Sequence, residues 1–376
     1  MIGSGGKSAI PDPRPTGSPT VPRWTIRARD PAVVGSDIAS DMAPPITFTY
    51  LNAHDVDRLQ LTESEIVEAV NAALIAQGTP GQAVIEPRVH LTPDPAFRGH
   101  FNVLRGYVAP LNLAGVKVVG DYIDNYKQGL PSEMAMLNLF DPRTGMPRAI
   151  IDATAITEMR TGALTAIGAR HLARPHAKIL GHVGARGTSY WNVRLLDHLF
   201  DFDEIRVHSR RPESREEFGA RLRADLGKEV IVTDSWERCL DGVDIAVEAS
   251  RLEQREELFK TSWIKPGALV IPYGTVSALE LSMTSAMQKI VVDDLGQFRA
   301  GNLGALRPQI NAGLLSEDGI HAELCQIVTG QRSGRTDDDE RILFWHRGLS
   351  LSDIGLGAVV LAKANRLGIG QTLVYA

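Results

Sequence analysis

The sequence predicts an α/β protein in which a Rossmann-type, doubly wound parallel sheet is joined to a discontinuous α+β domain. Short apolar strands alternate with helices from residue 178 onward, a pattern typical of wound parallel sheets. The region 83–151 instead holds β-branched and aromatic runs separated by Pro, Gly and Asp turns. A chain of 376 residues, 43% of them hydrophobic, is long enough for two cores.

The first 45 residues are rich in proline, glycine and serine. Such a composition buries too little apolar area to offset the entropy lost on ordering, so we expect a flexible leader over 1–45. Its start lacks the charged and apolar regions of a signal peptide.

Ordered structure is expected from Ile46. The segment 62–65, Thr-Glu-Ser-Glu, has the form of a capping box and predicts the start of a helix that ends near Gly78. Apolar residues then recur at helical spacing, which indicates one buried stripe: Ile66, Val67, Val70 and Leu74.

The middle region is predicted to be an antiparallel sheet followed by a long helix. A strong turn signal at 141–145 lies between two of its strands. Alanines spaced along 152–173 predict a helix with closely packing faces, which would link the two domains. The sheet's expected strand segments are 84–85, 101–104, 116–119 and 135–140.

The wound domain begins at Lys178, and a helical tail that includes 349–364 is expected to fold back onto the first domain. We therefore assign 46–152 and 330–376 to one domain, and 153–329 to the linking helix and the Rossmann domain. The expected parallel strands are 179–183, 204–208, 230–232, 243–247, 268–271 and 290–293.

Charge and composition argue for small-molecule partners. The net charge is -5 and the basic residues are scattered, so no footprint for nucleic acid or an anionic membrane is present. No apolar run approaches the roughly 20 residues that span a bilayer. Cys239 and Cys325 match no metal or redox spacing, and we expect inert buried thiols in a soluble, cytoplasmic protein.

A glycine-containing turn follows the first strand of the wound domain. There, backbone amides at a helix N-terminus can hold a pyrophosphate. The usual GxGxxG spacing would place glycine where Arg186 stands, so a plain strand-to-helix turn is the alternative, and Arg186 could instead lie along the phosphates. The predicted cofactor residues of this turn are Gly184, Ala185, Arg186, Gly187 and Thr188.

The second strand of the wound domain ends at Ser209, Arg210 and Arg211, where NAD enzymes commonly carry an acid for the ribose diol. A hydroxyl and two guanidinium groups suit a 2′-phosphate. The sequence therefore favours NADP(H) over NAD(H), with a solvated arginine turn as the alternative.

Several landmarks from Ile46 onward resemble the ornithine cyclodeaminase and mu-crystallin family. A lysine-bearing strand, an Arg-Thr helix and a downstream Rossmann turn follow one another in the same order. The landmarks are 116–119, 125–131, Gly145, 158–163, the glycine turn after Ile179, 322–324 with Gly330, and 348–353.

The resemblance implies hydride exchange between a nicotinamide and the α-carbon of an amino acid. Arg88 and Arg160 match the family's carboxylate-binding arginines, and Lys117 matches the lysine beside the substrate. The alternatives are a surface residue for Arg88, a structural ion pair for Arg160 and an exposed strand lysine for Lys117. Thr161 either touches the cofactor or caps its helix.

The sequence departs from the family in the loop 273–281, which lacks the aspartate expected to act on the substrate nitrogen. Loss of that acid should disable deamination and leave imine reduction possible. His346 could supply a proton near neutral pH, with a purely structural histidine as the alternative. Asp293 and Asp294 either line the cleft or form a solvated pair.

The resemblance thus implies an NAD(P)-dependent homodimer that reduces the imine of a 2-oxo acid to an amino acid, or catalyses the reverse oxidation. The dimer would form through the sheet of the first domain. Two alternatives stay open: a cyclodeaminase that releases ammonia from a diamino acid, and a binding protein that retains nucleotide with little turnover.

Overall fold

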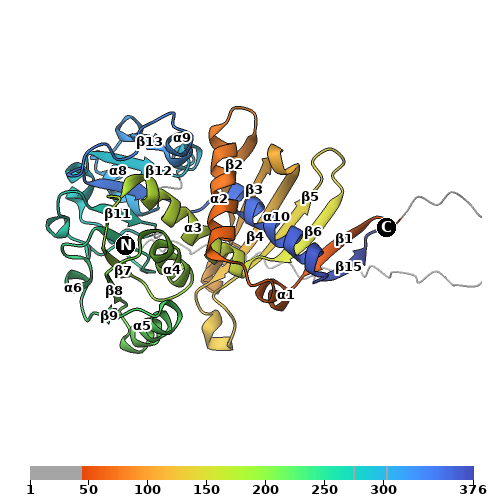
Figure 1. The fold of residues 1–376 in the computed structure, drawn as a ribbon, viewed down its shortest axis with the longest axis horizontal. Coiled ribbons are helices and arrows are strands. Elements are labelled where there is room, and N and C mark those ends of the chain that lie inside the picture. Colours follow the sequence, from red (N-terminus) through yellow and green to blue (C-terminus); the bar gives the residue numbers. More distant parts are fainter. Residues whose placement is uncertain (1–44, 274–275, 302–303) are drawn as a thin grey trace, which may run out of the picture. The chain divides into compact units, whose positions relative to one another are not determined.

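The computed structural model describes residues 45–273, 276–301 and 304–376, which belong to one compact unit with two sheets (Figure 1). The leader predicted over 1–45 lies, apart from Pro45, outside the described residues. The α/β class predicted from the strand patterns is confirmed.

The first sheet is mixed, with strand order β15-β1-β6-β5-β4-β3-β2. The pairs from β2 to β6 are antiparallel, as predicted, whereas β1 is parallel to β6 and antiparallel to the C-terminal β15. The strands are β1 (Thr47–Leu51), β2 (Ala83–Leu91), β3 (Gly99–Val108), β4 (Leu113–Tyr122), β5 (Glu133–Phe140), β6 (Pro147–Asp152) and β15 (Gln371–Val374).

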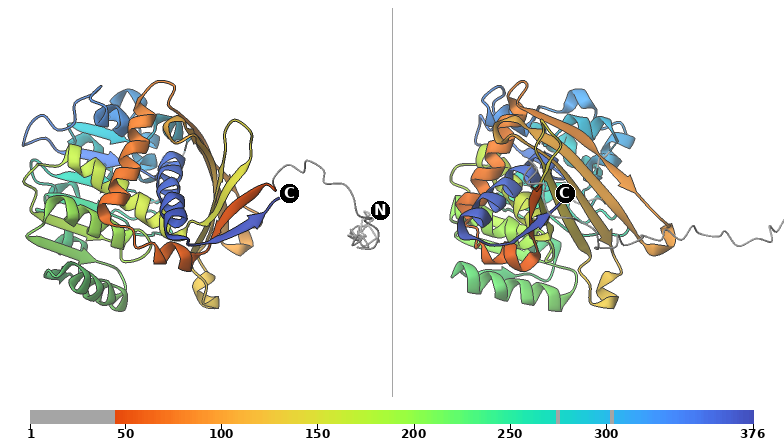
Figure 2. Two further views of the ribbon diagram at one scale, coloured as in Figure 1. Left: turned by 45° about the vertical axis from the view of Figure 1, so that its right-hand side comes forward. Right: turned by 90° about the vertical axis from the view of Figure 1, so that its right-hand side faces the viewer.

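Helices cover one face of this sheet. The helix α10 (Ser350–Leu367) packs on β3, β4 and β5, and α2 (Glu63–Gly78) packs on both α10 and α3 (Thr154–Leu172) (Figure 2). The capping box predicted at the start of α2 is confirmed, because Thr62 and Glu65 bond each other's backbone amides. The short α1 (Ala53–Arg58) follows β1.

The second sheet is fully parallel, with order β13-β12-β14-β11-β10-β7-β8-β9. The strand order reverses between β7 and β10, which is where doubly wound sheets bind ligands. Its strands are β7 (Ile179–Val183), β8 (Glu204–His208), β9 (Val230–Val232), β10 (Ile245–Glu248), β11 (Leu269–Pro272), β12 (Lys289–Val292), β13 (Ala322–Glu323) and β14 (Ile342–Trp345).

Helices of this region connect and flank the strands. They are α4 (Ser189–Phe200), α5 (Pro212–Leu226), α6 (Trp236–Leu240), α7 (Leu295–Arg299), α8 (Arg307–Asn311) and α9 (Leu324–Val328).

The stretch after Leu315 differs from the predicted helical tail. It contains β13, α9 and β14, and β14 inserts between β11 and β12. The run Ile342–Trp345 is entirely apolar, so periodicity could not separate a buried strand from a helix. The chain therefore leaves the second sheet only after Trp345, whereas the sequence placed that step near residue 330.

The described residues contain no helix that is both long and apolar enough to cross a membrane. Within the same ranges, no group of three or more His, Cys, Asp or Glu side chains could hold a metal ion. Cys239 and Cys325 are free and buried, which agrees with the expectation of buried thiols.

Candidate active site

Lys117 points from β4 toward the helices. The strand alternates so that Leu113, Gly115, Lys117 and Val119 face inward, and the Lys117 side chain is 1% exposed. Its Nζ donates to Asp353 Oδ1 at 2.6 Å and to Thr157 Oγ1 at 3.0 Å. The alternative of an exposed strand lysine is thereby wrong.

Arg160 reaches the same carboxylate oxygen from α3. Its Nε donates to Asp353 Oδ1 at 2.8 Å, and its Nη1 is buried without a hydrogen-bond partner. Gly348, at φ +80°, makes room for this group, since a Cβ there would lie 1.3 Å from Nη1. Arg160 thus forms an ion pair through Nε. Among the described residues, the terminal nitrogens of its guanidinium group have no recorded hydrogen bond and can bind a ligand.

Asp353 is the residue that sequence reasoning missed. Its side chain is fully buried on α10, and Lys117 Nζ and Arg160 Nε both lie within 2.8 Å of Oδ1. Two nitrogens that share this oxygen are no more than about 5.4 Å apart, and two unit charges at that separation would repel by at least about 3 kcal/mol at an effective dielectric constant of about 20. An acid directly before the apolar run 354–362 of this helix was the signal that could have identified it.

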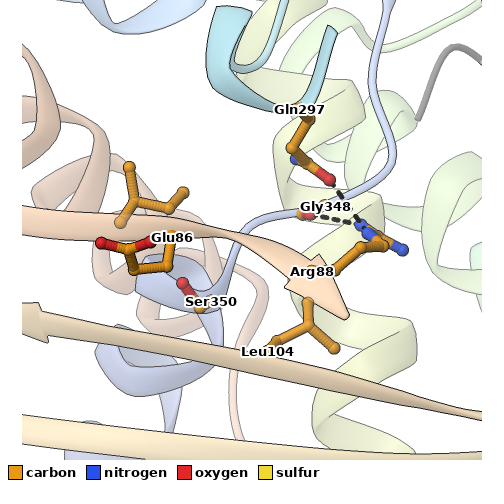
Figure 3. A pocket seen from close by; sticks show the side chains of 7 residues that line it. Glu86, Arg88, Leu104, Gln297, Gly348 and Ser350 are labelled. Carbon is orange, nitrogen blue, oxygen red and sulfur yellow. Dashed lines mark hydrogen bonds between the residues drawn. The ribbon is translucent and has the colours of Figure 1, made fainter. Parts of the chain in front are cut away.

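Arg88 lies on β2, where a register shift falls between Glu86 and Val89. Its Nε donates to Gln297 Oε1 at 2.9 Å, and its Nη2 donates to the carbonyl of Gly348 at 2.9 Å (Figure 3). The same Nη2 donates to the carbonyl of Arg347, also at 2.9 Å. The Arg88 side chain therefore connects β2 to the region of the second sheet by hydrogen bonds, and it is not a free surface group. The pocket there is lined by Ile85, Glu86, Arg88, Leu104, Gln297, Gly348 and Ser350.

Burial and neighbouring charges alter the acidity of these cations. Burial, helped by the charge of Arg160 and opposed by Asp353, lowers the pKa of Lys117 to about 7. Burial, helped by Arg347 and Arg160, lowers the pKa of Arg88 to about 9. Lys117 can therefore gain or lose a proton near neutral pH, while Arg88 stays charged.

The two predicted clamp arginines meet at Gly348, and Lys117 is linked to them through Asp353. The Gly348 carbonyl accepts from Arg88, and its Cα lies against Arg160 Nη1, which is in turn linked to Lys117 through Asp353. Asp293 Oδ2 accepts a hydrogen bond from the backbone amide of Gly348 at 3.1 Å. The solvated-pair alternative for Asp293 and Asp294 is wrong, since both are buried.

The turn after β7 fits a dinucleotide. Gly184 has φ +116°, and a Cβ there would lie 2.5 Å from the carbonyl oxygen of Ala249, which follows β10. Its amide donates to the carbonyl of His208 at 2.9 Å. Gly187, at φ +57°, has open space around it, so backbone can approach a phosphate at the start of α4.

The arginines expected to meet a 2′-phosphate lie at the end of β8. Arg210 and Arg211 are exposed, and Ser209 is half-buried between them and the strand. Arg186 extends from the glycine turn to Ser214 on α5, with Nη2 3.4 Å from Oγ. The hydroxyl and the three guanidinium groups therefore lie beyond the same strand end.

The pattern of the ornithine cyclodeaminase/mu-crystallin family matches residues 48–366. The chain belongs to this family. Lys117, Arg160, Arg88 and the glycine turn all fall inside the matched region.

One relative and two solved structures cover most of the chain. The alanine dehydrogenase of Archaeoglobus fulgidus is 28% identical over 330 residues, 86% of this chain and 98% of that protein. The Thermococcus litoralis Δ1-pyrroline-2-carboxylate reductase, solved with NADH and L-proline, has a TM-score of 0.80 at 27% identity, covering 86% and 99%. An archaeal alanine dehydrogenase dimer with bound NAD has a TM-score of 0.78 at 25% identity, covering 88% and 100%.

The loop in which this family member lacks the expected aspartate begins at Tyr273, and residues 274 and 275 lie outside the described ranges. The Tyr273 hydroxyl contacts the Thr188 hydroxyl at the start of α4 and accepts from Asn192 Nδ2 at 2.9 Å. Thr161 donates to the carbonyl of Thr157 at 2.7 Å, a bond within its own helix.

His346 directly follows β14 and is fully buried. Its Nε2 lies 2.9 Å from Thr165 Oγ1, and its ring stacks on Tyr273 and Phe344 with centroids 5.2 and 5.0 Å away. Burial, together with the charge of Arg160, lowers its pKa to about 3. A neutral, enclosed imidazole matches the structural alternative, so His346 is not carried into the proposed mechanism.

Proposed function

We propose that this family member is an NAD(P)-dependent oxidoreductase that reduces the imine of a 2-oxo acid to an amino acid, or catalyses the reverse oxidation. The observation that carries the proposal is the shared contact of Lys117 and Arg160 with Asp353, next to Arg88 at Gly348. The relatives whose names specify alanine dehydrogenation and pyrroline-2-carboxylate reduction support it.

The substrate carboxylate is assigned to the arginines. Arg160 uses Nε for Asp353, so the end of its fork can bind a carboxylate through two parallel bonds. Arg88 uses Nε and Nη2 for the protein and can add a bond only through Nη1. The clamp is therefore asymmetric, with Arg160 as its main element.

Lys117 is assigned to the substrate nitrogen. When bound, the nicotinamide supplies the hydride to the imine carbon, or takes it back in the reverse reaction. During reduction, the Lys117 ammonium donates one proton to the substrate nitrogen. The neutral Lys117 side chain then takes up a proton from solvent. The pKa of about 7 permits both steps near neutral pH.

For the cofactor, we favour NADP(H) because Ser209, Arg210 and Arg211 follow β8 where NAD enzymes commonly carry an acid, and Arg186 reaches Ser214 on the helix that comes next. The glycine turn would hold the pyrophosphate through Gly184, Ala185, Gly187 and Thr188. The two solved neighbours contain NADH and NAD, so the preference is a property proposed for this chain alone.

We propose a cytoplasmic homodimer formed through the outer face of the first sheet. Four apolar side chains on that face are between 43% and 52% exposed: Val84, Val89, Met134 and Met136. One solved neighbour is a dimer. Light scattering should give twice the chain mass, and Met136→Lys should give monomers; a monomeric wild type would reject the dimer.

The test of the function is a spectrophotometric assay of NADPH and NADH with 2-oxo acids plus ammonia or methylamine, and with Δ1-pyrroline-2-carboxylate. Cofactor oxidation that requires both the 2-oxo acid and the amine supports the proposal. Stoichiometric ammonia and proline from ornithine with NAD would instead support a cyclodeaminase. Tight NADPH binding without turnover would support a binding protein.

A further inference from the structure

We propose that Asp353 is the positioning residue of this site: one of its carboxylate oxygens fixes both the charge state of Lys117 and the direction in which Arg160 presents its fork. The inference rests on the proposed function, since it concerns the same two cations. It goes further by assigning a role to a residue that does not need to touch the substrate.

Asp353 is held rigidly where it can do this. It lies in the first turn of α10, and its amide donates to the carbonyl of Leu349 at 3.3 Å. The next residue, Ile354, packs on Gly115, since a Cβ at Gly115 would lie 2.6 Å from Ile354 Cγ1. Gly115 is on the inward face of β4 beside Lys117, so the helix and the lysine strand are fixed together at this point.

The Asp353 carboxylate orients the Arg160 side chain by accepting a hydrogen bond from one of its nitrogens. Because Asp353 Oδ1 accepts from Nε, the planar guanidinium is tied to this carboxylate through one nitrogen, and neither Nη is recorded in a bond to Asp353. Nη1 then occupies the place that a side chain at Gly348 would take. Among the described residues, the bond to Asp353 is the hydrogen bond that the structure records for the Arg160 side chain, so without the carboxylate the packing of Nη1 against Gly348 is the described contact that remains.

The carboxylate also determines whether Lys117 is charged. The groups that face Lys117 are Asp353 from α10, Arg160 from α3, Arg88 from β2 and, at longer range, Glu133 from β5. Within the described ranges, Asp353 is the anion in direct contact with the ammonium. Burial and both arginines favour the neutral amine, so removal of this one charge should leave Lys117 largely unprotonated at neutral pH.

The experiment compares Asp353→Asn with the wild-type enzyme and with Asp197→Asn as a matched control. Asp197 is also a buried acid that pairs with a lysine, Lys228 at 2.9 Å, but it lies on α4 in the second sheet's region. In D353N the basic limb of kcat/KM for imine reduction should move down by about one pH unit or more. In D197N that limb should stay at the wild-type position.

A second readout needs no substrate. In protein labelled with 15N-lysine, the Lys117 Nζ resonance, assigned by its loss in Lys117→Ala, should titrate about one unit lower in D353N than in the wild type. A folded D353N with the wild-type titration would overturn the inference. If no imine is reduced by the wild type, the proposed function fails, while this titration still decides the role of Asp353.

Asp353→Glu keeps the test decisive if D353N does not fold. The longer side chain retains the charge, so the Lys117 titration should stay within about half a unit of wild type. Its carboxylate is displaced by one methylene, so Arg160 should be misdirected and KM for the 2-oxo acid imine should rise by about tenfold. Wild-type KM and kcat in D353E would show that Asp353 does not orient Arg160.

Discussion

Lys117 and Asp353 are 236 positions apart in the sequence, yet Lys117 Nζ lies 2.6 Å from Asp353 Oδ1 in the interior of the protein. An isolated ammonium buried to this degree would cost several kcal/mol of desolvation. The ion pair offsets part of that cost and leaves a lysine whose protonation is balanced near neutral pH.

This balance predicts the pH dependence of the wild-type enzyme. Burial lowers the pKa of Lys117 to about 7, and the reduction requires its protonated form. The kcat/KM for imine reduction should therefore be high below about pH 7 and fall as pH rises through that value. The reverse oxidation, which needs the neutral amine, should rise over the same range; parallel profiles in the two directions would contradict the assignment.

Replacement of Lys117 by alanine should lower kcat by about 10²-fold to 10⁴-fold, because a positioned proton donor is lost. Cofactor affinity, measured by fluorescence titration with NADPH, should not change. Lys117→Arg keeps the charge without a readily transferable proton and should be comparably impaired. Unchanged turnover in K117A would remove Lys117 from the mechanism.

The two arginines should differ in importance. Arg160→Lys removes a two-pronged carboxylate contact and should lower kcat/KM by about 100-fold, which corresponds to about 3 kcal/mol. Arg88→Lys should cost about tenfold or less, because two of its nitrogens serve the protein. Steady-state kinetics with one imine substrate decides the order, and a larger loss in R88K would reverse the proposed asymmetry.

Substitution of Arg210 and Arg211 by alanine should raise KM for NADPH by about tenfold or more, because a charge-assisted contact contributes about 1.5–3 kcal/mol. KM for NADH should stay the same. Arg143→Ala, which removes a guanidinium that is 75% exposed in a remote turn, is the matched control. Equal effects on both cofactors would instead indicate a general structural role for these arginines.

Gly348→Ala should inactivate the enzyme. The residue has φ +80°, which costs about 1 kcal/mol for alanine, and the new methyl would collide with Arg160. Gly313→Ala, at φ +71° with open space around it, carries the same backbone strain without the collision. The unfolding temperature of G348A should fall by as much as that of G313A or by more, and of the two variants only G348A should lose activity.

Much of the fold could be predicted from sequence because local signals were sufficient. The predicted limits 179–183, 204–208 and 230–232 are those of β7, β8 and β9. Each is a short apolar run between turn residues, which periodicity identifies well. The placement of β14 could not be predicted in this way, since its position depends on pairing with β11 and β12 far along the chain.

The sequence could predict which residues belong to the site, but it could not predict the ion pairs and hydrogen bonds between them. Lys117 and Arg160 were recognised as candidates, but the acid that links them is supplied by a helix that follows the whole second sheet. The sequence predicted His346 as a possible proton donor. Its burial beside Thr165 could be known only from the packing of the folded chain. Burial and partners of charged groups are tertiary properties, so composition does not reveal them.

The position of α10 after β14 has a consequence for biosynthesis. Residues 350–367 are synthesised after both cations and after every described strand of the second sheet, so a nascent chain holds its lysine and arginine without their counter-ion until this helix has been made. Premature stops or C-terminal proteolysis before Asp353 should therefore yield fragments that retain the nucleotide region and have no turnover.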